Sequence, residues 1–132
     1  MYHRFGEDAY PSTSISVAQF DAHLAELKSG PYTVLPVQEI LAAMRAGKAL
    51  PDRTVGITID DAYLSVFTQA WPRLRKAGLP FTLFVATQPI DNGAKNYMSW
   101  DQIRAMRDAG VTIGSQGETH LHMAEADRKS TR

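Results

Sequence analysis

The stretch TVGITIDD, residues 54–61, decides the fold, because it is a run of mostly β-branched residues that ends in two aspartates. This composition is typical of a strand, and we predict a strand over 54–59 that ends at Asp60 and Asp61. A helical pattern of apolar residues follows over about 63–76 and stops at Gly78. The next apolar run, PFTLFVA at 80–86, is typical of a strand buried on both faces of a parallel sheet.

The same alternation of strand and helix extends in both directions from this segment. Toward the amino terminus we predict a strand at 2–5, a helix from the cap at 14–16 to Gly30, a strand at 32–35 and a helix over 37–44. Toward the carboxyl terminus we predict a loop over 88–98, a helix over 100–109 and a strand at 111–113. Pro72 should kink or restart its helix. We therefore predict an α/β fold with parallel strands, open or closed into a barrel, in one domain covering 1–132. The large side chains expected in its core include Trp71, Trp100, Met44, Met98 and Met106.

Composition excludes several classes of function. The 14 basic and 14 acidic residues balance, which argues against a general nucleic-acid binder and a polybasic membrane-surface domain. No apolar run is long enough for a membrane-spanning helix, and the first residues do not have the pattern of a secretory signal. The absence of cysteine excludes disulfides, thiolate metal sites and cysteine nucleophiles. None of these features predicts the compartment.

The carboxyl ends of the strands are where function is expected in such folds. Asp60 and Asp61 follow a buried strand, where two carboxylates without partners would be costly. A cation would remove most of that cost, with one carboxylate as ligand and the other free to act as a base. The alternative is that an aspartate caps the helix that follows.

A second group of polar residues follows the last predicted strand. His120 and His122 are two residues apart, and Gln116 lies four residues before His120. Imidazole suits zinc and other first-row divalent ions, often together with carboxylates. His3, in the first strand, would lie on the same rim if the strands are parallel. The alternatives are exposed loop histidines and a structural His3.

With these residues in view, the chain resembles the polysaccharide deacetylases, the carbohydrate esterases with a NodB-homology domain. Residues 58–62, TIDDA, are similar to the family's first motif, T-F-D-D-G. Residues 113–115, followed by Gln116 and His120, resemble the second motif, which has two histidines four residues apart. Segments 1–4, 81–85 and 98–103 are also similar to the family. The resemblance covers nearly the whole chain but only the amino-terminal part of the family domain, and it implies a partial, distorted (β/α) barrel.

The resemblance also implies a chemistry. The family contains metal-dependent hydrolases of non-peptide C–N bonds that remove N-acetyl, or in some cases O-acetyl, groups from polysaccharides, often outside the cytoplasm. Asp60 matches the catalytic base, and Asp61 and His120 match ligands of a divalent metal, with zinc expected. Gln116 takes the place of the first metal-binding histidine. His3 and His122 are additional candidates, and the expected partner is an N-acetylated polysaccharide or oligosaccharide.

Other hypotheses remain open at this point. Gln116, the replacement of glycine by Ala62, and the missing later motifs favour a catalytically impaired carbohydrate-binding or assembly module of the same fold. A phosphoacceptor receiver is a weaker alternative, because the later strands end in Thr87 and Gly114 rather than in an acceptor aspartate and a lysine. Half a barrel would leave a sheet edge open, which predicts a homo-oligomer or pairing with another chain.

Overall fold

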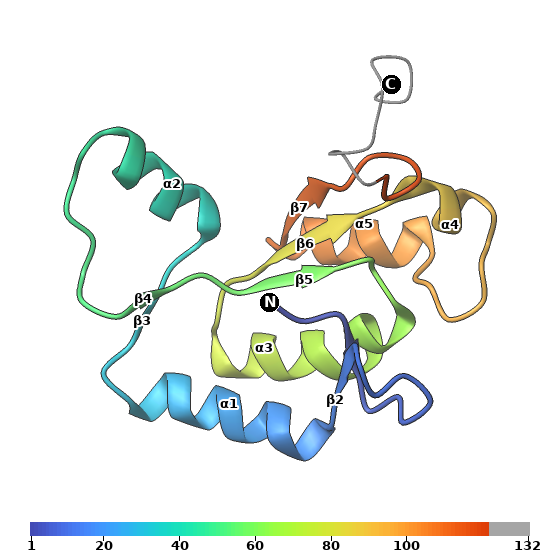
Figure 1. Ribbon diagram of the computed structural model, residues 1–132, viewed down its shortest axis with the longest axis horizontal. Helices are drawn as coiled ribbons and strands as arrows, with labels where there is room; N and C mark the ends of the chain where they lie inside the picture. The colour runs from blue at the N-terminus through green and yellow to red at the C-terminus, as the bar shows by residue number, and fades with distance from the viewer. Residues whose placement is uncertain (122–132) are drawn as a thin grey trace.

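The structure is a computed structural model that describes residues 1–121. At its centre lies a parallel three-stranded sheet in the order β5-β6-β7 (Figure 1). These strands span Thr58–Asp60, Thr82–Val85 and Thr112–Ser115. The amino-terminal segment lies beside β5, since Tyr2 forms a parallel bridge with Ile59. The predicted α/β class and the parallel strands are confirmed, and the sheet does not close into a barrel within residues 1–121.

Two smaller parallel pairs accompany the central sheet. One joins β1 (Arg4–Phe5) to β2 (Ser14–Ile15), and the other joins β3 (Thr33–Val34) to β4 (Thr54–Val55). The second pair and the helix α2 (Val37–Arg45) extend away from the central sheet in Figure 1. The side chain of Gln38 at the start of α2 donates to the Thr112 hydroxyl of β7 at 3.1 Å.

The remaining helices cover the central sheet. They are α1 (Val17–Ser29), the π-helical turn η1 (Val66–Ala70), α3 (Trp71–Ala77), the short α4 (Thr87–Asp91) and α5 (Trp100–Asp108). Helices α1 and α3 contact each other on one side of the sheet (Figure 1). The predicted caps are confirmed, because Ser16 accepts from the Gln19 backbone and Ser99 forms a complete capping box with Gln102.

The core confirms most of the apolar pattern. The fully buried side chains include Phe5, Phe20, Ile59, Leu74, Leu83 and Met106. They come from β1, α1, β5, α3, β6 and α5, so one hydrophobic core connects the sheet with the helices on both sides. No helix among residues 1–121 is both long and apolar enough to cross a membrane.

Three local predictions differ from the structure, and one strand was missed. The predicted strand over 54–59 is two strands, because the chain passes from the β3 pair to the central sheet at residues 56–57. The predicted loop over 88–98 begins with α4, in which Pro89 lies in the first turn, where a missing N–H costs little. The strand β2 was not predicted, since two residues are too few for a period. Met44 was predicted in the core but is 64% exposed, because no side chain of α2 is buried.

Candidate functional site

The acidic pair lies in a tight turn at the carboxyl end of β5. Asp60 is the last residue of the strand, and its N–H donates to the Tyr2 carbonyl at 2.9 Å. Asp61 and Ala62 both have left-handed backbone conformations, with φ of 73° and 54°. Successive residues of a strand point to opposite faces, so a change of backbone conformation directly after Asp60 is what allows both carboxylates to reach the same rim.

The turn brings Asp61 to the segment that follows β7. The Nε2 atom of His120 lies 3.3 Å from Oδ1 of Asp61. The backbone N–H of Asp61 donates to the side-chain oxygen of Gln116 at 3.2 Å. Parallel strands place their carboxyl ends at one edge of the sheet, which is why these three residues meet although β6 lies between their strands.

Asp60 contacts a different histidine. The Nε2 atom of His3 lies 3.9 Å from Oδ2 of Asp60, and only 14% of the Asp60 side chain is exposed. Burial raises the pKa of Asp60 above its ordinary value, and the neighbouring Asp61 adds to the rise, whereas His3 and His120 oppose it. A carboxylate with a raised pKa is a stronger proton acceptor than an exposed one, which is a property expected of a general base.

The structure thus brings together Asp60, Asp61, Gln116, His120 and His3 on one rim. His122, the remaining candidate, lies outside the described residues. The alternative interpretation of the aspartates as helix caps is not supported, because no side-chain hydrogen bond caps η1 and Ser65 is the residue before it.

Asp61 and His120 offer a carboxylate oxygen and an imidazole nitrogen, a donor pair that suits a divalent ion such as zinc. The two atoms lie 3.3 Å apart, which is the distance of an ion pair if the histidine is protonated. Among residues 1–121, no group of three histidine or acidic side chains is arranged to hold a metal ion, and Gln116 contacts the pair through the Asp61 N–H.

An aromatic stack beside the acidic turn was not predicted. The Arg4 guanidinium lies between the Tyr10 and Tyr63 rings, 3.9 and 3.4 Å from their centroids, and pairs with Glu7 at 3.3 Å. Tyr63 also packs against Tyr97 at a centroid distance of 4.8 Å. The stack fixes the segment that carries His3 against the segment that follows Asp61. Nothing in the local sequence pattern predicts it, because its members come from three separate segments, 4–10 and the regions of Tyr63 and Tyr97.

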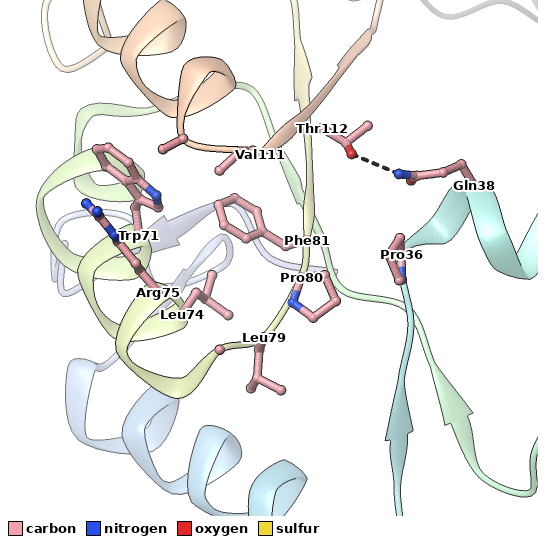
Figure 2. Close-up of a pocket in the computed structure, with 13 residues that line it drawn as sticks. Pro36, Gln38, Trp71, Leu74, Arg75, Leu79, Pro80, Phe81, Val111 and Thr112 are labelled. Atoms are coloured by element: carbon pink, nitrogen blue, oxygen red, sulfur yellow. Dashed lines mark hydrogen bonds between the residues drawn. The ribbon is translucent and has the colours of Figure 1, made fainter.

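A different pocket, of about 290 Å³, lies at the amino ends of β6 and β7 (Figure 2). Trp71, Leu74 and Phe81 contribute to its apolar lining, and the bond between Gln38 and Thr112 lies at its border. The acidic turn lies at the opposite, carboxyl ends of the strands. This pocket therefore does not belong to the candidate site.

Comparison with known proteins places these observations in a family context. The polysaccharide deacetylase family model matches residues 47–132. The poly-β-1,6-N-acetyl-D-glucosamine N-deacetylase of Staphylococcus aureus is 32% identical over 111 residues, which are 83% of this chain and 37% of that protein. The chain spans less than half of the length of the curated relatives it matches.

Solved structures are similar over a comparable part. The structure of IcaB from Ammonifex degensii matches with a TM-score of 0.76 and 27% identity, covering 99% of this chain and 55% of that one. The Streptococcus pyogenes deacetylase PplD, solved in complex with acetate, matches with a TM-score of 0.79 and 22% identity over 96% of this chain and 58% of that one. At 22% identity, the similarity to PplD supports the fold alone.

Proposed function

Because the chain belongs to the polysaccharide deacetylase family, we propose that it carries the acidic part of an active site that removes acetyl groups from an N-acetylated polysaccharide. The observation that carries the proposal is the contact between Asp61 and His120, with Asp60 beside them on the same rim. The Staphylococcus aureus relative is named for poly-β-1,6-N-acetyl-D-glucosamine, which makes a polymer of N-acetylglucosamine the first substrate to test.

In this proposal the two aspartates have different tasks. Asp61 and His120 hold a divalent metal ion, and zinc is the first candidate for this donor pair. Such an ion supplies Lewis-acid polarisation of the acetyl carbonyl and lowers the pKa of a bound water. Asp60 accepts the proton of the water that adds to the acetyl carbon. The C–N bond then breaks, acetate is released, and the amine leaves with a proton supplied by a general acid.

Neighbouring residues support these tasks. His3, 3.9 Å from Asp60, interacts with the charge of the base and opposes part of the rise in its pKa. Burial raises the pKa of Asp60, so a proton accepted from water is held more firmly than by an exposed aspartate. In this proposal the general acid comes from the later motifs of the family domain. Acetate release by this chain alone is therefore expected to be weak or absent, although metal binding should remain.

The test measures acetate release from N-acetylglucosamine oligomers, with and without added Zn²⁺ or Co²⁺. It is run on the chain and, in parallel, on the chain extended to its complete reading frame. Asp60→Asn removes the base, and Asp52→Asn is the matched control, because Asp52 is exposed and lies before β4. We expect metal-stimulated release by the extended protein that Asp60→Asn abolishes and Asp52→Asn leaves unchanged. Equal release by the two variants would contradict the role of Asp60.

The replacement of a metal-binding histidine by Gln116 favours a second candidate function, a carbohydrate-binding or assembly module that has lost catalysis. Calorimetry separates the two. A module without the metal site would bind the oligomers and would bind Zn²⁺ no more tightly than its His120→Ala variant. The deacetylase proposal predicts that His120→Ala weakens Zn²⁺ binding at least about tenfold.

A further inference from the structure

Gln116 connects two strands that are not neighbours in the sheet. Its backbone N–H donates to the Val85 carbonyl of β6 at 2.9 Å, which fixes its main chain directly after β7. Its side-chain oxygen accepts the N–H of Asp61 at 3.2 Å. The side chain therefore reaches across the end of β6 to the turn that follows β5.

The turn that Gln116 contacts is a strained one. Asp61 and Ala62 are consecutive non-glycine residues with positive φ, a conformation that costs roughly 1–2 kcal/mol for each residue. Such a turn persists only when surrounding contacts hold it. Two contacts do so on either side of Asp61, since the Asp60 N–H donates to Tyr2 and the Ala62 carbonyl accepts from Met98. At Asp61 itself, the contact is made by Gln116.

We infer that Gln116 is a positioning residue, whose amide oxygen holds the left-handed turn at Asp61 and thereby directs the Asp61 carboxylate toward His120. The inference rests on the proposed function in one respect, because the benefit of this arrangement is the binding of a cation by Asp61 and His120. The resemblance assigns this position to a metal ligand. In this chain the side chain instead acts on the metal site through the backbone of Asp61.

The first readout needs no metal and no activity. Hydrogen exchange of the Asp61 amide is measured by NMR in the metal-free chain, for wild type, Gln116→Met and Gln116→Glu. Methionine has a similar length but no amide oxygen, whereas glutamate keeps an oxygen that can accept the bond. We expect exchange at least about tenfold faster in Gln116→Met and close to wild type in Gln116→Glu. Gln88→Met is the matched control, because Gln88 is exposed, and it should leave Asp61 unchanged.

The second readout is Zn²⁺ affinity by calorimetry on the same proteins. We expect Gln116→Met to bind Zn²⁺ about 10- to 100-fold more weakly than wild type, the usual effect of losing a residue that orients a ligand. Faster Asp61 exchange together with weaker binding supports the inference. Weaker binding with unchanged Asp61 exchange overturns it, since Gln116 would then act on the ion directly. Faster exchange with unchanged affinity also overturns it.

The proposed metal site and the positioning role of Gln116 can fail separately. If the wild-type chain binds no Zn²⁺, the proposed metal site is wrong, and the positioning of the turn is then decided by Asp61 exchange alone. Protected amides of Leu83 and Ile113 in each variant show that the central sheet is folded, so that a change at Asp61 is local.

Discussion

A close contact in the central sheet gives a prediction about the stability of the fold. Gly114 in β7 is paired with Phe84 in β6. A Cβ atom at residue 114 would lie 2.5 Å from Cδ1 and Cε1 of Phe84, whereas ordinary contact begins at 3.4 Å. Gly114→Ala therefore requires the ring or the strand to move by about 0.9 Å. Overpacking of this kind costs about 1–3 kcal/mol, or a fall in Tm of roughly 3–12 °C for a chain of this size.

Guanidinium unfolding followed by tryptophan fluorescence measures the effect, since the chain has two tryptophans. Phe84→Leu is the second variant, because leucine lacks the ring atoms that meet the new methyl group. If the ring causes the loss, the double variant will be more stable than the sum of the single effects predicts. A Gly114→Ala protein within about 0.5 kcal/mol of wild type, or additive effects in the double variant, would refute the steric argument.

Four further predictions concern charge, aromatic packing and assembly. Because burial raises the pKa of Asp60, its charged form is disfavoured in the folded state. Asp60→Asn should therefore raise Tm at pH 7, measured by scanning fluorimetry. The gain in Tm should vanish below the ordinary aspartate pKa, near pH 3.5, because the wild-type carboxyl is then protonated in both the folded and the unfolded state. An equal gain in Tm at both pH values would contradict this. Burial also raises the pKa values of Tyr2 and Tyr63, so an alkaline absorbance titration should show two of the five tyrosines ionising after the others. Arg4→Lys should lower stability by about 1–2 kcal/mol in guanidinium, because lysine cannot stack between two rings as the planar guanidinium does; an unchanged midpoint would argue against the stack. Within residues 1–121, β7 pairs with β6 on one side only, so light scattering at high concentration should show a dimer or larger species, and a monomer at every concentration would contradict open-edge pairing.

The sequence predicted those parts of the fold that depend on local patterns. The apolar run at 80–86 and the serine caps of α1 and α5 are such features, and the structure confirms each. Whether the apolar face of α2 is buried could not be predicted in the same way. Its apolar spacing is regular, yet Leu41 and Met44 are exposed, because a period shows which side chains share a face and does not show whether another element covers that face.

The candidate site was predictable in position but not in detail. Parallel strands bring their carboxyl ends together, which is why Asp61 and His120 could be expected to meet. The bond from the Asp61 N–H to Gln116 is made from a turn in which Asp61 and Ala62 both have positive φ, and a sequence with alanine at residue 62, where the motif has glycine, gives no sign of that turn. The stack of Arg4 between two tyrosines depends on contacts between distant segments, which no local pattern contains.

The two aspartates are adjacent in sequence, yet they contact different histidines. Asp60 is held within the strand and faces His3, whereas Asp61 is turned by its left-handed backbone toward His120. Two carboxylates on one extended strand would point to opposite faces and could not share a reaction. The strain at Asp61 and Ala62 is therefore the structural cost of placing the carboxylates of Asp60 and Asp61 on one rim. Ala62 is fully buried and its carbonyl accepts the Met98 N–H, so the turn is held by packing and hydrogen bonds without the glycine that would relieve the strain. Arg53 and Asn96 also have positive φ, so a left-handed residue alone does not mark a site; what distinguishes Asp61 and Ala62 is that two of them are consecutive, at a point where two carboxylates and two histidines converge.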